Sequence, residues 1–377
     1  MAEAYILAGE PSGDVLASAL MRALATDYQG WHGIGGPLMK DAGLVSKHDF
    51  QKLHILGLSE AIRHYASLKK LLHQMIDEVC QLRPDIIFTV DTKAFSLRFA
   101  KELKKKMAQI GWSAPIIHMV APTIWAYGAG RKAAFEDAFD GMLCLFPMEM
   151  GLFDAKKLKT AFIGHPAAYR PVISRPVVTP SQDHPLSVLL LPGSRRSEVS
   201  RLLPKFLQAC EMIAKQQNIT VIIPTIESVA DDVKNLSKNS GIEITIDVKK
   251  TAVQDAFSSC DVMIAASGTV TLEAALAAMP GITAYQLSPM IAAVMRRRFQ
   301  LNDPILPNII LNDRVYPFFF QKHVTAQNLA NAILKQSEDA DTTQAKLTKQ
   351  AEALRRALTT DDDSFEAAIQ RAVNSLF

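Results

Sequence analysis

The segment at residues 265–280, AASGTVTLEAALAAMP, begins at the end of a predicted strand. The residues that follow the strand are small, so a ligand can approach the backbone closely there. The strand is expected to end at Ala265 or Ala266, and the turn after it consists of Ser267, Gly268 and Thr269. The first amides of the helix that follows have no partner within the helix, so they can bind a diphosphate. Glu273, one turn into that helix, can accept hydrogen bonds from ribose hydroxyls. The alternative is an ordinary N-cap with a capping-box glutamate.

A second anion-binding turn is expected within residues 189–199, LLLPGSRRSEV. A buried strand leads into Gly193 and Ser194, and Gly193 lets a ligand lie against the backbone. Arg195 follows at the carboxyl end of that strand, where its guanidinium can bind phosphate through several donors. The alternative is a solvated turn whose arginines lie near a surface acid. We expect phosphate binding for Arg195 and the solvated turn for Arg196.

Asp91 closes the apolar run DIIFTVD, at the carboxyl end of a predicted central strand. A carboxylate there can take a proton from an attacking hydroxyl, which makes Asp91 a candidate general base. The alternative is a cap for the helix that begins near Ala94. Residues 8–20, AGEPSGDVLASAL, bring two further acids into a tight turn, which predicts either a helix cap or a substrate contact.

Aromatic residues follow another predicted strand in VAPTIWAYGAGR, residues 120–131. Pro122 restricts this loop, and Trp125 and Tyr127 offer flat apolar surface. At a strand end, such side chains can line an acyl or sugar pocket. The alternative is that they belong to the hydrophobic core, which is the commoner position for them.

Alternating strands and helices must position these residues. In the first half, short apolar runs typical of buried parallel strands occupy residues 4–8, 31–35, 85–90, 115–120, 141–146 and 160–164. In the second half, similar runs occupy residues 186–191, 219–225, 242–247, 261–266 and 281–287. Amphipathic segments lie between them, so the chain is predicted to be α/β, with parallel sheets covered by helices.

A proline-rich stretch at residues 165–185 is the expected linker between two domains. The boundaries we predict are 1–167 and 168–357, and a helix at about 358–377 that packs back on the first domain stays an open alternative. Because open parallel sheets bind ligands beyond the carboxyl ends of their strands, two such domains facing a cleft predict a two-substrate site.

The composition limits the classes of function that this chain can have. With 377 residues, 49% of them hydrophobic, the chain can bury two cores. Its net charge of +3 does not favour a nucleic-acid-binding protein held by bulk charge. The four cysteines have no metal-ligand spacing and are expected to be reduced thiols of a cytoplasmic protein. We expect no secretion signal and no membrane-spanning segment.

Seven blocks together resemble the lipid-A-disaccharide synthases in order and spacing: AGEPSGD, the Asp91 strand end, APTIWAY, FIGHP, LPGSRRSEV, SGTVTLEAAL and LPNIIL. The resemblance implies a GT-B glycosyltransferase with two Rossmann-like domains, an N-terminal one for the acceptor and a C-terminal one for the UDP-sugar. Members of this family join UDP-2,3-diacylglucosamine to 2,3-diacylglucosamine 1-phosphate (lipid X). They release UDP and form the β-1,6-linked lipid A disaccharide with inversion, and they need no metal or other cofactor.

Carried onto this sequence, the resemblance implies roles for individual residues. Asp91 is the first choice for the base and Glu10 the second, while Asp14 is expected to cap its own helix. The UDP-binding residues would be Gly193, Ser194, Arg195, Ser267, Gly268, Thr269, Glu273 and Asn308. The acceptor or acyl pocket would include Ser12, Gly13, Pro122, Trp125, Tyr127 and Arg131.

Two departures from the family pattern lie on the acceptor side. Lys93 and Ala94 stand where relatives usually carry a second acid, and Tyr127 and Gly128 stand where Trp-Arg is common. Arg131 is a candidate for the missing charge. These departures concern the details of acceptor binding more than the type of reaction.

Acylated substrates imply contact with an anionic membrane, and residues 289–301, PMIAAVMRRRFQL, suit it. The apolar and basic contacts would be Met290, Ile291, Val294, Arg296, Arg297, Arg298 and Phe299. The alternative is a core helix with a basic last turn. VYPFFFQ, residues 315–321, adds aromatic surface, for which a core position is the stronger alternative. The expected location is therefore peripheral, on the inner face of the inner membrane, and a homodimer stays an open alternative.

Other functions remain compatible with the residues. One is another GT-B transferase or a UDP-sugar epimerase with a soluble substrate. Another is a non-catalytic protein that binds a UDP-sugar or lipid, which the missing second acid near Asp91 would suit. A dehydrogenase is disfavoured because neither half opens with a GxGxxG fingerprint.

Overall fold

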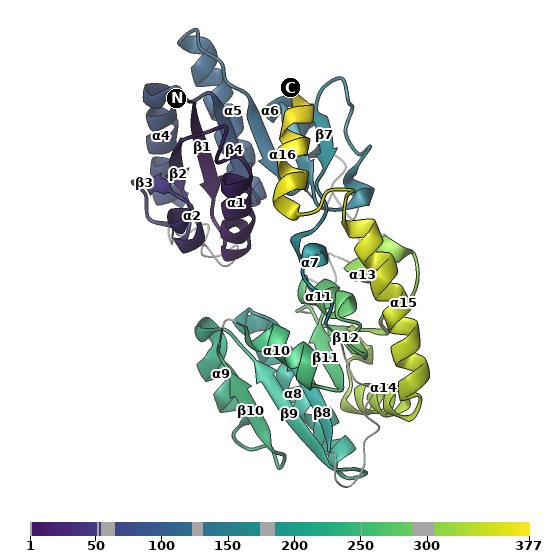
Figure 1. Ribbon diagram of the computed structural model, residues 1–377. Coiled ribbons are helices and arrows are strands. Elements are labelled where there is room, and N and C mark those ends of the chain that lie inside the picture. The colour runs from purple at the N-terminus through teal and green to yellow at the C-terminus, as the bar shows by residue number, and fades with distance from the viewer. Residues whose placement is uncertain are drawn as a thin grey trace. The chain divides into compact units, whose positions relative to one another are not determined.

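The computed structural model describes residues 2–50, 53, 65–122, 131–173, 185–249, 251–288 and 305–377 (Figure 1). The chain forms two compact units. Unit 1 comprises Met1–Tyr169 together with Leu358–Phe377, and unit 2 comprises Arg170–Ala357. The chain therefore passes from one unit to the other twice.

Unit 1 contains a parallel sheet of seven strands in the order β3-β2-β1-β4-β5-β6-β7. Six of its strands coincide with the predicted runs. The three-residue edge strand β3 was not predicted. The bounds are β1 (Glu3–Ala8), β2 (Gly30–Ile34), β3 (Leu44–Ser46), β4 (Ile86–Val90), β5 (Ile116–Met119), β6 (Gly141–Cys144) and β7 (Lys159–Phe162).

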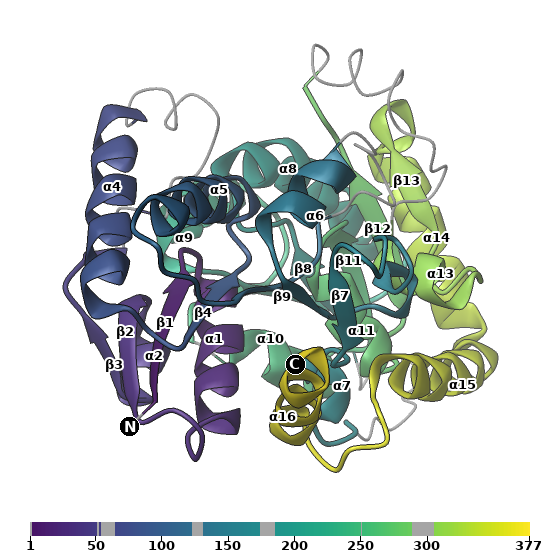
Figure 2. The same ribbon diagram turned by 90° about the horizontal axis from the view of Figure 1, so that it is seen from above.

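Helices cover both faces of this sheet (Figure 2). One face carries α4 (Tyr65–Leu82), α5 (Lys93–Gln109) and α6 (Lys132–Ala138), which pack in one apolar cluster with β1, β4 and β6. The other carries α1 (Pro11–Ala23) and α16 (Phe365–Leu376), which pack together. The remaining short helices are α2 (Pro37–Asp41), the 3-10 helix η3 (Pro147–Glu149) and α7 (Pro166–Tyr169).

The last helix, α16, packs against β6 and β7 of unit 1 although unit 2 precedes it in the chain. Its buried residues recur at helical spacing and form one stripe: Phe365, Ala368, Ile369, Ala372, Val373 and Leu376. Gly141 leaves room for this contact, because a Cβ there would lie 2.7 Å from Leu376 Cδ1.

Unit 2 contains a parallel sheet of six strands in the order β10-β9-β8-β11-β12-β13. The bounds are β8 (Leu186–Leu191), β9 (Ile219–Pro224), β10 (Ile244–Asp247), β11 (Val262–Ala266), β12 (Gly281–Tyr285) and β13 (Phe318–Phe320). All five predicted runs are strands. The aromatic run is an edge strand in which Phe319 packs against the core, while Phe318 and Phe320 stack on each other.

The helices of unit 2 again lie on both faces of its sheet (Figure 2). One face carries α8 (Arg196–Ala214), α9 (Glu227–Ser237) and α14 (Ala326–Glu338), and the crossover direction puts α10 (Ala252–Ser259) and α11 (Val270–Leu276) on the other. The remaining helices are α13 (Leu306–Leu311), the 3-10 helix η4 (Gln321–His323) and α15 (Ala340–Leu358).

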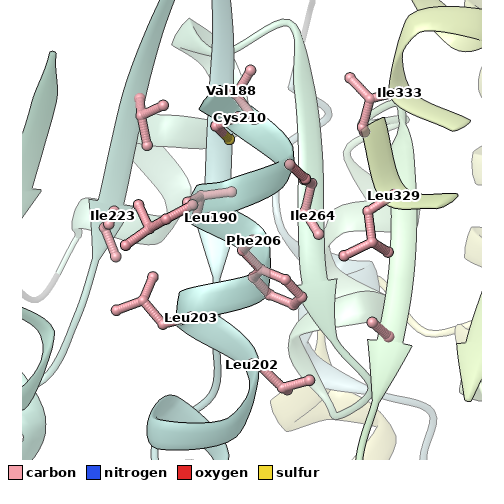
Figure 3. Close-up of a cluster of buried hydrophobic side chains, with 14 of the residues drawn as sticks. Val188, Leu190, Leu202, Leu203, Phe206, Cys210, Ile223, Ile264, Leu329 and Ile333 are labelled. Carbon is pink, nitrogen blue, oxygen red and sulfur yellow. The ribbon is translucent and has the colours of Figure 1, made fainter. Parts of the chain in front are cut away.

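The core of unit 2 is built around Phe206 of α8, which is fully buried between β8, β11 and α14 (Figure 3). Leu190 and Ile264 approach it from the sheet, and Leu329 and Ile333 from α14. Because such interiors are close-packed, a truncation here leaves a cavity that its neighbours fill only in part.

We expect Phe206→Ala to lower the free energy of unfolding of unit 2 by about 3–5 kcal/mol, since it loses apolar burial and leaves a cavity. Denaturant unfolding followed by circular dichroism measures the change. Phe320→Ala is the matched control because Phe320 is 36% exposed, and its effect should stay below about 1 kcal/mol. Equal effects of the two substitutions would contradict the assignment of Phe206 to the core.

Candidate functional site

The strand order of unit 1 reverses between β1 and β4, so the turns after these neighbouring strands leave in opposite directions. Glu10, in the turn after β1, and Ser12, in the first turn of α1, are both exposed, and the turn after β4 begins with Asp91. A Cβ on Gly13 would lie 3.5 Å from the Val90 carbonyl oxygen and 4.0 Å from Asp91 Cβ. The structure therefore brings the GEPSGD turn and the predicted base together.

Asp91 lies in a strained turn. Its φ is 51°, and that of Thr92 is 45°, in the left-handed region that non-glycine residues rarely adopt. Two hydrogen bonds hold the turn: the Asp91 amide donates to the Met119 carbonyl at 3.0 Å, and Ser96 Oγ donates to the Asp91 carbonyl at 2.9 Å. Strain of this kind persists where the surroundings enforce it, and it is common at functional sites.

The Asp91 side chain is not a helix cap, since Thr92 is the N-cap of α5. Its carboxylate is 23% exposed, and Lys93 Nζ lies 4.0 Å from Oδ1. The alternative of a structural cap is therefore wrong, and the carboxylate is accessible for a ligand.

The prediction for Asp14 is also wrong. Asp14 lies within the first turn of α1, and its carboxylate accepts hydrogen bonds from the amides of Leu38 and Met39, at 3.0 and 3.1 Å. It therefore caps α2 instead of its own helix. Glu10 occupies the N-cap position of α1, where its carbonyl accepts from the Asp14 amide at 2.9 Å.

Glu149 is a further acid at this edge of the sheet, in addition to Glu10 and Asp91, that the sequence analysis missed. It is 1% exposed, and Oε2 accepts hydrogen bonds from the amides of Leu145 and Phe146 at 2.9 and 3.1 Å. Burial raises the pKa of Glu149 from its ordinary 4.5 to about 7, against the opposing effects of these amides and of Lys93. An acid shortly after the apolar run that ends at Phe146 was the available signal.

His118, on β5, is a buried polar residue near the same edge. Its Nδ1 lies 2.7 Å from Thr89 Oγ1, and its ring stacks on Phe139 with centroids 4.7 Å apart. Burial, reinforced by the charge of Lys93, lowers the pKa of His118 from 6.5 to about 3, so the ring is neutral at physiological pH. Lys93, one of the departures from the family pattern, thus acts electrostatically on both His118 and Glu149.

Some of the remaining acceptor-side and membrane-contact residues lie within the described residues, and others do not. Pro122 is buried directly after β5, and Arg131 is exposed at the N-cap of α6. Trp125 and Tyr127 lie outside the described residues, as do all seven predicted membrane contacts between Met290 and Phe299. Among the described residues, no helix is long and apolar enough to span a bilayer.

Unit 2 repeats the same arrangement, because its strand order reverses between β8 and β11. The two predicted anion-binding turns follow these neighbouring strands, whose register pairs Leu191 with Ala265. A Cβ on Gly268 would meet nothing within 4 Å, so the turn after β11 is open. Among the described residues, no backbone group accepts a hydrogen bond from the amides of Gly268, Thr269 or Val270.

The turn after β8 requires glycine. Gly193 has a φ of 108°, and a Cβ there would collide with the Glu198 side chain. Arg195 is the N-cap of α8, and its Nη1 lies 3.2 Å from Glu198 Oε1, on a side chain that is 64% exposed. Arg196 pairs with Asp232 at 3.2 Å and is largely exposed, as the solvated-turn interpretation predicted.

Glu273 does not form the capping box considered for it. Its carboxylate instead accepts from Arg170 Nη1 at 3.3 Å and from Gln254 Nε2 at 3.2 Å, both through Oε2. Asn308 is buried, and its carboxamide bonds to the backbone of Val315 and Tyr316. Asn308 therefore holds the turn after α13.

Comparison with known proteins identifies the family. A family model described as lipid-A-disaccharide synthetase matches residues 4–372. The chain belongs to this family. It is 34% identical to the lipid-A-disaccharide synthase of Rhodospirillum centenum, over 87% of this chain and 83% of the relative. It is also 34% identical to that of Paramagnetospirillum magneticum, over 94% and 91% of the two chains.

Solved structures confirm the predicted fold class of two doubly wound α/β domains. The UDP-GlcNAc 2-epimerase from Neisseria meningitidis bound to UDP-GlcNAc has a TM-score of 0.62 at 11% identity, over 100% of this chain and 99% of that one. Acinetobacter baumannii MurG has a TM-score of 0.54 at 16% identity, over 99% and 100%. Because the sequence identities are this low, the comparison with these structures shows only that this chain has the GT-B fold.

The raised pKa of Glu149 predicts a pH-dependent stability. Below about pH 4.5 the carboxyl is neutral in both states. As the pH rises from about 4.5 through about 7, the unfolded state ionises first and the folded state loses stability. Glu149→Gln removes this loss, so the difference in the free energy of unfolding between the variant and wild type should shift in favour of the variant across that window, by about 3 kcal/mol.

Denaturant unfolding at a series of pH values between 4 and 8 measures this difference. Glu227→Gln, at an exposed position on α9, controls for the general effect of removing one carboxylate. A constant difference between Glu149→Gln and wild type at every pH would contradict the raised pKa.

Proposed function

We propose that this chain joins UDP-2,3-diacylglucosamine to 2,3-diacylglucosamine 1-phosphate and releases UDP, with inversion at the anomeric carbon. The observation that carries the proposal is the family match across residues 4–372. The strand-order reversals of the two units support it, because the GEPSGD turn and Asp91 lie at one, and the turns at Gly193 and Gly268 lie at the other. The product would be the β-1,6-linked disaccharide 1-phosphate of lipid A.

For the donor, we propose that UDP binds at the carboxyl ends of β8 and β11. The open amides of Gly268, Thr269 and Val270 and the exposed Arg195 would bind the diphosphate, with Gly193, Ser194 and the Ser267 side chain beside them. Negative charge grows on the diphosphate as the bond from the sugar breaks, and preorganised N–H donors and a guanidinium stabilise that charge. The Glu273 carboxylate would accept hydrogen bonds from the ribose hydroxyls.

For the acceptor, we propose that Asp91 is the general base. Its accessible carboxylate would take the proton of the 6-hydroxyl while the oxygen forms a bond to the anomeric carbon of the donor. The bond between that carbon and the diphosphate oxygen breaks, and its electron pair leaves with UDP. Glu10 is the second candidate for the base, and Ser12, Gly13, Pro122, Trp125, Tyr127 and Arg131 are proposed to line the acceptor or acyl pocket.

Asp91→Asn should lower kcat by at least about 100-fold, because the amide cannot accept the proton. Its affinity for UDP should stay unchanged. The assay mixes purified protein with both acylated substrates and measures UDP release and disaccharide formation. Glu10→Gln is the matched comparison, and a larger loss in that variant would assign the base to Glu10 instead.

The same assay tests the function itself. A wild-type protein that forms no disaccharide would refute the proposed activity. An epimerase would change the donor sugar without any acceptor, so omission of lipid X separates the two activities.

We also propose that residues 289–301 attach the protein to the anionic inner face of the inner membrane. Replacement of Arg296, Arg297 and Arg298 by glutamate should weaken binding to anionic vesicles at least about tenfold, since each basic side chain near such a surface contributes about 1 kcal/mol. Vesicle sedimentation measures the binding. Replacement of the same residues by lysine is the control that retains it, and equal binding of both variants would contradict the proposal.

A further inference from the structure

The Glu273 carboxylate is held from one side only. Arg170 Nη1, at 3.3 Å, and Gln254 Nε2, at 3.2 Å, both donate to Oε2. Within the described part of the chain, Oε1 accepts no hydrogen bond from any residue. Two donors from separate segments therefore fix the carboxylate and leave one oxygen available to a ligand.

The Arg170 backbone is itself fixed. Its carbonyl accepts a hydrogen bond from Arg355 Nη1 at 2.7 Å. Arg170 is the first residue of unit 2, and Arg355 lies on α15 close to Ala357, where unit 2 ends. The two ends of the unit 2 chain thus meet beside Glu273. Burial lowers the pKa of Arg355.

Stability alone is a weak explanation for the pair of Arg170 and Glu273. Their side chains are 47% and 27% exposed, and ion pairs in that range are screened by solvent and contribute little to folding. A free glutamate side chain occupies several rotamers, and fixing it in one of them costs conformational entropy that weakens ligand binding. A carboxylate that is already oriented avoids this cost when the ligand binds.

We propose that Arg170 and Gln254 are positioning residues for the donor nucleotide, which hold Glu273 Oε2 so that Oε1 faces the ribose hydroxyls. This proposal rests on the proposed function, which assigns the ribose to Glu273. Arg355 contributes indirectly, because its hydrogen bond to the Arg170 carbonyl holds the Arg170 backbone in place. Neither Arg170 nor Gln254 touches the reacting atoms.

The test compares the affinities for UDP and for 2′,3′-dideoxy-UDP, measured by isothermal titration calorimetry on the full chain. The ratio of the two dissociation constants reports the contribution of the ribose hydroxyls. Wild type should prefer UDP. Arg170→Met and Gln254→Leu should each weaken UDP binding about fivefold, the equivalent of one hydrogen bond, and should hardly change binding of the dideoxy compound.

Two variants make the test specific. Arg170→Lys keeps a positive donor at this position and should restore most of the preference for UDP. Arg371→Met removes an ion pair of similar exposure, with Asp362 in unit 1, and should leave both affinities unchanged. Circular dichroism and thermal unfolding check that each variant is folded.

Each other result overturns the proposal. Tighter UDP binding by Arg170→Met would mean that Arg170 competes with the ribose for Glu273. An undiminished preference for UDP in both variants would mean that neither residue orients the carboxylate. If wild type forms the disaccharide but binds both nucleotides equally, the ribose role of Glu273 fails while the proposed function stands. If wild type forms no disaccharide, the proposed function fails first.

Discussion

The parallel hydrogen-bond ladder is the constraint on which both units depend. Each parallel strand delivers its carboxyl end to the same edge of the sheet, and the connecting helices return the chain to the opposite edge. Where the strand order reverses, at β1 and β4 and again at β8 and β11, the two turns lead to opposite faces of the sheet, and no crossover connection passes over them. Asp91, the proposed base, and the turn at Ser267, the proposed diphosphate site, lie at these two points, so the strand order alone accounts for their positions within each unit.

Much of this arrangement could be predicted from the sequence. Buried parallel strands appear as runs of β-branched and aromatic residues, and a turn follows each one, so the strands and the edge that carries the site were both predictable. The edge strands β3 and β13 are three residues long and pair on one side only, which leaves too little periodicity to detect. The fold class and family were confirmed, and the roles of individual site residues stay predictions.

Contacts between distant segments could not be predicted. Asp14 has the sequence context of a cap for its own helix, yet its partners Leu38 and Met39 lie on α2, which only the tertiary fold brings close. The same holds for Arg170 and Gln254 at Glu273. Glu149 was overlooked because its sequence does not reveal that the side chain is buried, and burial is what raises its pKa.

The placement of α16 has a consequence for synthesis on the ribosome. Strands β6 and β7 leave the ribosome before unit 2 is made, whereas the helix that covers them follows unit 2 in the chain. Until then, the apolar patch around Gly141 lacks Leu376 and its neighbours, and nascent chains with such uncovered surfaces are prone to aggregate. Unit 2 is continuous in sequence, so all of its residues are synthesised before α16. Unit 1 begins synthesis earlier but cannot complete its fold until α16 has been made.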